Sequence, residues 1–502
     1  MSEPAARTTE RPHPPGTYPV VVVGSGPGAL QTSYCLTRLG VEHALLSSDD
    51  RPGGMFRHFP IFQRLISWSK PYSPSERGSR AYQRYDWNSL LAEDREHQAL
   101  VPEAMDGTSY FPSRAEMEAG IVAFAERTGV RARYSCTWES TERTDDGFVL
   151  TTSDGEYRCR VAIFAVGMAQ PWKPSIPGLD QVPHYVETRE PKEYAGRNVF
   201  IIGKRNSGFE LADGLLPWAR QLFIASPRPA HLSVLTRSLA GARARYLQPY
   251  EDHVLGGGNF VIDAVIERVD RTANGFRVQV KGTTTPGDQL FEVDDVIAAT
   301  GFEVPMQDLP ELGVATFMQG RLPAQTPYWE SASVPGIYFS GTIMQGAVGL
   351  KKYGIPGSSG AVHGFRNNAR LLARHIAEKH LGIVLPRPEV AAPHLADLLL
   401  DEATNAPELW NQVSYLAAAF SSGDGRWSNE GIVPLAHFVD SGPRNGIAIA
   451  VETDPSGDIH PAVYVRRDGE VEEHLLRSSP THDYTGAEHK RELSSIITTI
   501  RT

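Results

Sequence analysis

The residues of this chain that are best suited to chemistry lie in two glycine-rich turns. The first turn, in VVVGSGPGALQ, places Gly24, Gly26 and Ala29 in a G-x-G-x-x-G/A spacing between a valine-rich run and a helical pattern. Gly24 permits a tight turn, Gly26 lets the backbone approach a pyrophosphate, and Ala29 lets a helix pack closely on a strand. The N-terminus of that helix would direct its dipole toward the anion. This context favours a dinucleotide-binding turn over a purely structural one.

The acidic residue that usually binds the ribose hydroxyls is missing from the end of the second strand. Ser47 occupies its expected position, and Asp49 follows two residues later. Either side chain could hydrogen-bond a ribose, so the sequence leaves the assignment open between them.

The second turn, in IIGKRNSGFELA, departs from the same spacing at one position. Gly203 and Gly208 stand where glycines are expected, but Arg205 occupies the middle position. A side chain there would crowd a pyrophosphate lying directly on the turn. Lys204 and Arg205 nevertheless bring positive charge to the place where phosphates should lie. We therefore expect a second nucleotide-binding turn here.

The elements that must position these turns occur twice in the same order. Each unit is predicted to contain a buried strand, the turn, a helix, a second strand and a three-stranded meander. In the first unit, elements are expected at 18–23, 29–39, 43–46, 114–127, 131–166, 336–340 and 360–380, with long loops and short helices at 57–110. In the second unit, they are expected at 198–202, 209–218, 221–225 and 260–299. The meanders also end alike, in VAIFAVG and DVIAATG, which indicates an internal duplication.

Composition narrows the class of protein. The chain of 502 residues carries a net charge of -10, which argues against nucleic-acid binding. Its three cysteines, Cys35, Cys136 and Cys159, contain no C-x-x-C pair, which argues against a redox-active dithiol. The polar, proline-rich N-terminus lacks a signal peptide, and no run approaches the ~18 apolar residues of a membrane span. We expect a cytoplasmic protein without a membrane partner, and leave homo-oligomer formation open.

Four motifs in order resemble a known family. GSGPGA at 24–29, GGMF at 53–56, GKRNSG at 203–208 and AATGF at 298–302 look like the motif set of class B flavoprotein monooxygenases. That group includes flavin-containing, Baeyer–Villiger and N-hydroxylating monooxygenases. The resemblance covers about residues 18–380. It implies an FAD domain interrupted by an NADPH domain, with FAD and NADPH as cofactors and molecular oxygen as co-substrate.

The motifs and their neighbours supply the expected site residues. In the second turn, Asn206 and Ser207 match the NSG/NSA element of the family's NADPH domains, and Asn206 is expected to act in catalysis. Arg228, or alternatively Arg237, would bind the 2′-phosphate that distinguishes NADPH from NADH. The residues expected to contact a cofactor are Gly24, Gly26, Pro27, Gly28, Ala29, Ser47, Asp49, Gly53, Gly54, Met55, Phe56, Trp68, Trp138, Gly167, Gly203, Lys204, Arg205, Asn206, Ser207, Gly208, Arg228, Thr300, Gly301, Phe302, Gly341 and Thr342.

A shorter resemblance points to the amine N-hydroxylases. Their S-F-L-K-D element is similar to SWSKP at 67–71, which would place Lys70 in a catalytic position near the flavin, with Trp68 beside it. A solvated loop lysine is the alternative. The family fingerprint F-x-G-x-x-x-H is reduced to His184, which favours heteroatom oxygenation over Baeyer–Villiger chemistry.

The resemblance implies a monooxygenase that oxygenates a nucleophilic heteroatom, foremost an amine nitrogen, of a small molecule through a flavin hydroperoxide. An amine or amino acid is the expected substrate. The alternatives are an NADPH-dependent FAD reductase that passes electrons to a carrier, and a catalytically silent FAD-binding protein.

The predicted fold class is α/β, with two nested Rossmann-like dinucleotide-binding domains for FAD and NADPH, β-meanders and a C-terminal α+β extension. The expected boundaries are a disordered N-terminus at 1–16, the FAD domain at 17–195 and 291–385, the NADPH domain at 196–290, and an extension of unknown role at 386–502. A linker is expected at 386–393.

Overall fold

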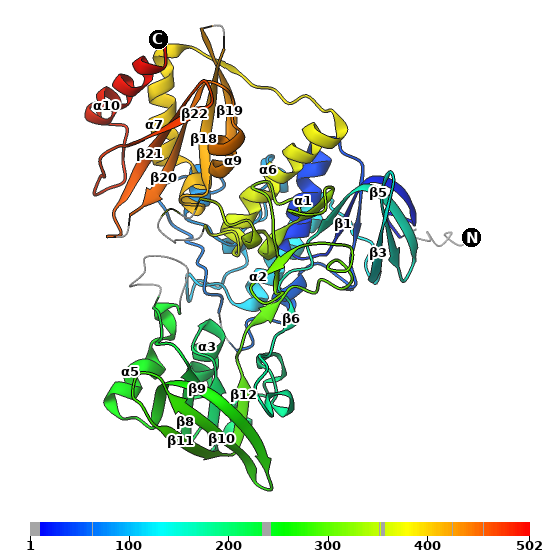
Figure 1. Cartoon of the computed structure of the whole chain (residues 1–502), viewed down its shortest axis with the longest axis vertical. Helices are drawn as coiled ribbons and strands as arrows, with labels where there is room; N and C mark the ends of the chain where they lie inside the picture. The colour runs from blue at the N-terminus through cyan, green and yellow to red at the C-terminus, as the bar shows by residue number, and fades with distance from the viewer. Residues whose placement is uncertain are drawn as a thin grey trace, which may run out of the picture.

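The computed structural model describes residues 11–62, 64–232, 242–350, 352, 357–423, 425–454 and 456–501 (Figure 1). Of the predicted disordered N-terminus, residues 1–10 lie outside the description, but residues 11–16 are ordered against the first domain. Arg11 forms an ion pair with Asp154, and His13 Nε2 hydrogen-bonds Arg131 O. The expected disorder is therefore wrong for residues 11–16.

The first domain is built on a six-stranded sheet in the order β2-β1-β5-β4-β3, with β16 also beside β5. Its strands are β1 (Gly16–Val23), β2 (His43–Leu46), β3 (Trp138–Thr144), β4 (Gly147–Thr152), β5 (Gly155–Phe164) and β16 (Ile337–Phe339). β1, β2, β5 and β16 are parallel, whereas β3 and β4 form the antiparallel meander. The valines of β1 are buried on both faces, as a central parallel strand requires.

Helices cover this sheet and set the direction of the first turn. They are α1 (Pro27–Arg38), α2 (Arg114–Thr128) and α6 (Val362–Leu381), and α1 and α6 share one hydrophobic core. α2 begins with a capping box, in which Ser113 Oγ accepts from Glu116 N at 3.2 Å and Glu116 Oε2 accepts from Ser113 N at 2.6 Å. As expected, the chain between residues 54 and 103 forms loops with short 3-10 helices, at Gly54–Arg57, Ala81–Arg84, Arg95–His97 and Val101–Glu103.

The second domain contains another six-stranded sheet, in the order β11-β10-β9-β8-β7-β12, and forms a separate lobe (Figure 1, bottom). Its elements are β7 (Asn198–Ile202), α3 (Asn206–Leu215), β8 (Gln221–Ser226), α5 (Gln248–Leu255), β9 (Asn259–Thr272), β10 (Gly275–Gly282), β11 (Asp288–Val293) and β12 (Asp295–Ala298). Because β12 pairs with β7, the second domain extends to about residue 298. The predicted boundary at 290 lies too early. The domains are joined by an antiparallel pair, β6 (Gln170–Pro171) and β13 (Phe302–Glu303).

The C-terminal extension is an antiparallel sheet with helices, which confirms the predicted α+β pattern. Its strands, in the order β17-β19-β18-β20-β21-β22, are β17 (Glu389–Val390), β18 (Leu416–Gly423), β19 (Arg426–Pro434), β20 (Gly446–Thr453), β21 (Ile459–Arg467) and β22 (Glu470–Leu475). Its helices are α7 (Leu395–Asn405), α8 (Pro407–Asn411), α9 (Leu435–Ser441) and α10 (Ala487–Thr498). α7 and α10 share a core with one face of the sheet, and α9 with the other. The expected linker at 386–393 is partly wrong, because β17 joins the sheet edge.

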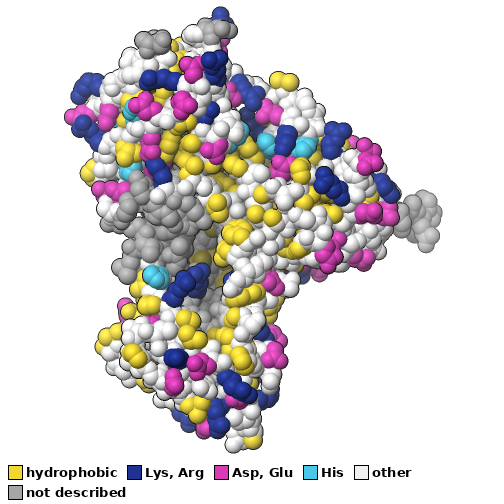
Figure 2. Space-filling view, viewed as in Figure 1, with side chains coloured by type: hydrophobic (Ala, Val, Ile, Leu, Met, Phe, Trp, Pro, Cys, Tyr) yellow, Lys and Arg dark blue, Asp and Glu magenta, His cyan; other side chains and the backbone are white. Residues whose placement is uncertain are grey.

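The surface has a mixed charge. Acidic and basic side chains are interspersed over the face shown in Figure 2. In the part of the chain that the structure describes, no helix combines the length and apolar character needed to cross a membrane.

Candidate active site

The first glycine-rich turn and the GGMF motif each contain a position that accepts only glycine. Gly24 has φ +134, and a Cβ there would lie 2.5 Å from Ala165 O. Gly54, from the GGMF motif, has φ +56, and its Cβ would lie 2.8 Å from Gly26 Cα. The two motifs that sequence reasoning placed on one cofactor thus lie in direct backbone contact.

This turn opens into a cavity of about 460 Å³, which we call the turn cavity. α1 starts there at Gly26 without any side-chain cap, so its first N–H groups remain free for an anion. The expected cofactor residues that line it are Gly24, Gly26, Pro27, Gly28, Ser47, Asp49, Gly54, Met55, Phe56, Trp138, Gly167, Gly341 and Thr342. Ala29 is instead buried in the core between α1 and the sheet. The residues present therefore fit a dinucleotide pyrophosphate.

Both candidates for the ribose contact line the turn cavity. Ser47 Oγ accepts a hydrogen bond from Asp49 N at 3.1 Å. Ser25 Oγ donates to Asp49 Oδ2 at 2.6 Å, which holds this carboxylate beside the turn. The structure thus brings the two alternatives together rather than selecting one of them.

The second turn tolerates Arg205 for a backbone reason. Arg205 is the N-cap of α3 and has an extended conformation, which any residue can adopt. The glycine requirement falls on its neighbours: Gly203 has φ +127, and a Cβ on Gly208 would lie 2.0 Å from Gly203 O. The exposed Arg205 side chain can therefore reach a ligand beside the turn without straining it.

The side chain of Lys204 points to β9 and not to the place where the motif predicts phosphates. Its side chain is buried, and its ammonium donates to Ile262 O at 2.9 Å and pairs with Asp263 on β9. Burial lowers its pKa, and Asp263 partly opposes this effect. Lys204 thus ties the turn to β9, so its charge is already neutralised and its expected phosphate contact stays a prediction. Arg228 is exposed just beyond β8, and its alternative, Arg237, lies outside the described residues.

A second cavity of about 600 Å³ lies where the domains meet, and we call it the junction cavity. It adjoins the turn cavity, because Phe56, Thr342 and Phe365 line both. Arg205 and Asn206 reach it from the second turn, and Asn206 Oδ1 also accepts from Arg243 N at 2.9 Å. The residues at the N-terminus of α6 line it too, and this helix has no side-chain cap. The two predicted turns therefore line neighbouring cavities.

Sequence reasoning missed His363, which lines this junction cavity. Its ring stacks on Trp87 at 4.3 Å between centroids, and Trp87 packs on Trp68 at 4.7 Å. His363 is 2% exposed, and Nδ1 has no partner among the described residues. Burial, followed by the charges of Arg366 and Arg243, holds its pKa well below the usual value, so the ring is neutral at pH 7. No spacing in the sequence indicates this contact, because α6 is far from Trp87 along the chain.

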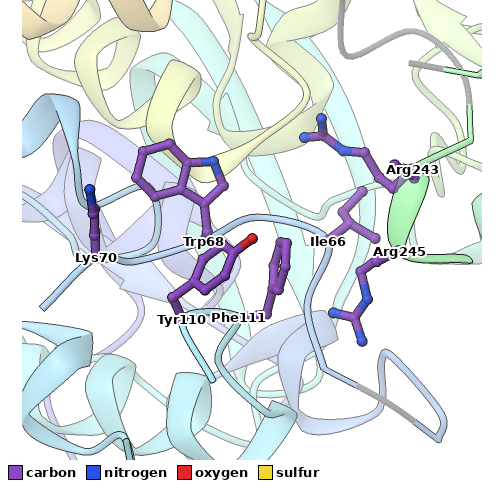
Figure 3. A pocket seen from close by; sticks show the side chains of 8 residues that line it. Ile66, Trp68, Lys70, Tyr110, Phe111, Arg243 and Arg245 are labelled. Carbon is purple, nitrogen blue, oxygen red and sulfur yellow. The ribbon is translucent and has the colours of Figure 1, made fainter. Parts of the chain in front are cut away.

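Lys70 and Trp68 line a third cavity of about 640 Å³, which we call the outer pocket (Figure 3). Its lining residues are Ile66, Trp68, Lys70, Tyr110, Phe111, Arg243, Ala244 and Arg245. It adjoins the junction cavity through Ile66 and Arg243. Lys70 is exposed and lines the outer pocket only, so its expected place beside the flavin stays a prediction.

The AATGF motif forms contacts across the domain junction. Thr300 Oγ1 donates to Trp172 O at 2.6 Å, and Gly301 O accepts from Trp172 N at 3.0 Å. His184 Nε2 hydrogen-bonds Gly301 O at 3.0 Å, and its ring packs edge-on against Phe302. These residues stabilise the segments where the chain passes between the two domains. Their expected cofactor contacts stay predictions.

None of the three thiols is positioned for redox chemistry. Cys35, Cys136 and Cys159 are all buried and unpaired. Burial raises the pKa of Cys35 to about 11 and that of Cys159 to about 12. Because thiolates are the reactive species, burial disfavours the reactive form of these cysteines.

The C-terminal extension touches the walls of the site. Gln412 Nε2 donates to Ser359 Oγ at 2.9 Å and to Asn368 Oδ1 at 2.7 Å, and Ser359 lines the junction cavity. Arg80 pairs with Glu402 and Glu408, which anchors the loop that carries Trp87. The extension therefore supports two segments that shape the cavities.

The fold and the paired turns define a two-dinucleotide-domain oxidoreductase. Residues 21–341 match the pyridine nucleotide-disulphide oxidoreductase family, and the chain belongs to it. A curated relative from Mus musculus, "FAD-dependent oxidoreductase domain-containing protein 2", is 27% identical over 433 residues, which cover 79% of this chain and 63% of the relative. The chain spans about three fifths of the length of the first curated relatives that it matches.

Solved structures share the fold at low identity. Bacillithiol disulfide reductase from Staphylococcus aureus has a TM-score of 0.56 at 15% identity, covering 72% of this chain and 99% of that one. The ornithine N-hydroxylase of Kutzneria sp. 744 has a TM-score of 0.54 at 17% identity, covering 72% of this chain and 100% of that one. The predicted likeness to flavoproteins that include N-hydroxylating monooxygenases is confirmed as a likeness of fold.

Proposed function

We propose that this chain is an FAD- and NADPH-dependent monooxygenase acting on a nucleophilic heteroatom, foremost an amine nitrogen, of a small molecule. The overall reaction consumes substrate, O2, NADPH and a proton, and yields oxygenated substrate, NADP+ and water. When bound, the two cofactors supply the hydride transfer and the reaction with oxygen. The protein supplies binding, orientation and exclusion of water.

The observation that carries this proposal is that the three cavities adjoin one another through shared lining residues. The turn cavity suits the pyrophosphate of FAD, and Phe56 and Thr342 carry its lining into the junction cavity. Arg205 and Asn206 would bring the nicotinamide half of NADPH to that same space. The outer pocket beyond Arg243 then provides room for a third reactant. A monooxygenase needs such a compartment beside the place where its cofactors meet.

The residues of the junction have separate roles in this proposal. The N–H groups at the start of α6 favour negative charge in the junction cavity, because the helix has no side-chain cap there. The neutral ring of His363, held by Trp87, closes one wall without adding charge. Asn206 holds the backbone of Arg243, which keeps the second turn aligned with the outer pocket.

The main rival is a reductase that passes electrons to a disulfide or a carrier. The disulfide version lacks support within this chain, because its three thiols are buried and far from reactive in pKa. A reductase acting on a carrier protein, and a catalytically silent FAD-binding protein, remain as alternatives that an experiment separates.

The experiment measures NADPH oxidation, oxygen uptake and hydrogen peroxide in the same reaction, with and without a panel of primary amines and amino acids. We expect oxygen uptake equal to NADPH consumption, and an amine that lowers the peroxide yield while an oxygenated product appears. NADPH oxidation that requires an added electron carrier and consumes no oxygen would show a reductase. Absence of oxidation in FAD-loaded protein would show a silent one.

A further inference from the structure

The outer pocket combines aromatic and cationic side chains in an unusual proportion. Trp68, Tyr110 and Phe111 supply three rings, whereas Lys70, Arg243 and Arg245 supply three positive charges. None of its eight described lining residues is acidic. This local composition contrasts with the net charge of -10 of the whole chain.

Two of the three cations have neither a hydrogen-bond nor an ion-pair partner for their side chains within the described residues. Neither Lys70 Nζ nor the Arg243 guanidinium takes part in a hydrogen bond or ion pair there, and the buried Nε of Arg243 is unsatisfied. Burial lowers the pKa of Arg243, which indicates a guanidinium that has lost water without gaining an anion. An unpaired, partly buried charge of this kind is costly, unless a ligand completes it.

Arg245 shows by contrast what a structural arginine looks like in the same pocket. Its guanidinium donates to Arg64 O at 3.1 Å and to Leu65 O at 2.6 Å, and lies 4.9 Å from the centre of the Phe111 ring. In Figure 3 it points away from Trp68, whereas the Arg243 guanidinium points toward Trp68. Arg243 is therefore the cation available to a ligand lying on the aromatic side chains.

The segment that supplies Arg243 contains basic but no acidic residues. Residues 227–250 contain four arginines and no aspartate or glutamate. The residues of this segment that lie outside the description therefore cannot bring a carboxylate to Arg243. The positive character of the pocket follows from the sequence of the crossover between β8 and α5.

We propose that the outer pocket binds a carboxylate that carries a flat aromatic ring, with the carboxylate on Arg243 and the ring against Trp68 and Tyr110. Trp68 packs against Trp87 with the rings tilted by 31°, and Tyr110 is 53% exposed. An aromatic ring would cover both side chains, while a guanidinium can hold a carboxylate through two parallel hydrogen bonds. Lys70 adds a second positive charge on the far side of Trp68 in Figure 3. The identification of this ligand as the substrate rests on the proposed function, under which the ligand also carries the nucleophilic heteroatom.

The same chemistry, a flat ring with an anion, is also offered by the adenosine 2′-phosphate end of NADPH. The position of the pocket favours the substrate. Arg243 and Arg245 reach it from the end of the basic segment nearest α5, whereas the expected 2′-phosphate residue, Arg228, lies at the opposite end beside β8.

The test uses isothermal titration calorimetry on the purified full chain with its bound flavin, and needs no turnover. The probes are 3-phenylpropionate, its neutral counterpart 3-phenylpropionamide, and 2′,5′-ADP. We expect the carboxylate to bind at least tenfold tighter than the amide, and Arg243→Gln to abolish that preference. Arg243→Lys keeps the charge without the fork geometry, so it should keep a reduced preference and report on folding. Arg277→Gln, on the exposed face of β10, is the matched control and should keep the full preference.

Equal binding of carboxylate and amide by the unaltered protein, or a preference that survives Arg243→Gln, would overturn the proposal. Displacement of 3-phenylpropionate by 2′,5′-ADP would assign the pocket to the nucleotide and overturn its assignment to substrate. Binding of both probes at once supports the assignment. A protein that shows the Arg243-dependent preference but consumes no oxygen with NADPH would refute the monooxygenase and leave the carboxylate pocket intact.

Discussion

Gly28 and Gly341 lie in direct backbone contact, although they belong to opposite ends of the first domain's sequence. A Cβ on Gly28 would lie 2.3 Å from Gly341 Cα. Ser340 Oγ donates to Gly28 O at 3.2 Å and shares a 2.7 Å hydrogen bond with Thr32 Oγ1. Gly28 is thus required by the fold itself. Gly26 is not, because a Cβ there would meet only Gly54 Cα, at an ordinary 3.8 Å.

The first prediction uses this difference. Gly26→Ala should leave the unfolding temperature of the flavin-free protein nearly unchanged but weaken FAD binding at least tenfold, because the added methyl group enters the turn cavity. Gly28→Ala should instead lower the free energy of unfolding by about 1–3 kcal/mol through overpacking. Flavin absorbance and thermal unfolding measure the two effects. Full flavin retention in Gly26→Ala would contradict the pyrophosphate assignment.

The second prediction concerns the choice between NADPH and NADH. Arg228→Gln should raise the KM for NADPH about tenfold or more, because a charge-assisted contact to the 2′-phosphate contributes about 1.5–3 kcal/mol. The KM for NADH should hardly change. Arg220→Gln, another exposed arginine of the second domain, is the control. Equal losses for the two cofactors would exclude Arg228 from the 2′-phosphate site.

The third prediction concerns Lys70. Lys70→Met should lower the product formed per NADPH and raise the peroxide released. Without the charge of Lys70, the carboxylate of the substrate is held less firmly, so the substrate reacts less often. Since Lys70 is exposed, we expect a change of about threefold, corresponding to less than 1 kcal/mol as for exposed charge pairs. Lys281→Met on β10 should leave the ratio unaltered. If Lys70→Met forms as much product per NADPH as the unaltered protein, Lys70 is a solvated loop lysine with no role in substrate binding.

The fourth prediction concerns stability in acid. His375 stacks on Tyr328 at 4.1 Å, and burial, followed by the charge of Lys379, lowers its pKa from 6.5 to about 4. The unfolded chain binds the proton first, so this contribution is complete above about pH 6.5 and declines as the pH falls toward 4. At pH 5 the loss should be at most about 2 kcal/mol. His375→Phe keeps an aromatic ring without the titration.

Urea unfolding at pH 7 and pH 5 measures this effect. The difference between the two pH values should be smaller in His375→Phe than in the unaltered protein. An identical difference would show that His375 is not an acid-sensitive group.

The fifth prediction addresses the extension. Gln412→Met removes two hydrogen bonds to Ser359 and Asn368, and leaves buried polar atoms unsatisfied. We expect a loss of about 1–3 kcal/mol in stability and a larger peroxide yield, because Ser359 belongs to the wall of the junction cavity. Gln279→Met, an exposed position on β10, is the matched control. A stable variant with unaltered peroxide yield would show that the extension does not support the cavity.

The sequence by itself determined the local parts of this protein. Strand periods, the Ser113 capping box and the glycine spacing at Gly24 and Gly203 depend on residues close together in the chain, so they can be recognised without the fold. The duplication of the nucleotide domains follows for the same reason, because each unit repeats a local pattern.

Only the tertiary structure decided which residues meet. The pairing of Lys204 with Asp263 and the stack of Trp87 on His363 both join segments distant in sequence. The lack of a partner for Arg243 Nε among the described residues is likewise visible only in the fold. The observed end of the second domain differs from the predicted one for a similar reason, because β12 joins its sheet only through pairing with β7. Whether a charge is free or neutralised depends on such long-range contacts and on burial, and no residue spacing encodes either directly.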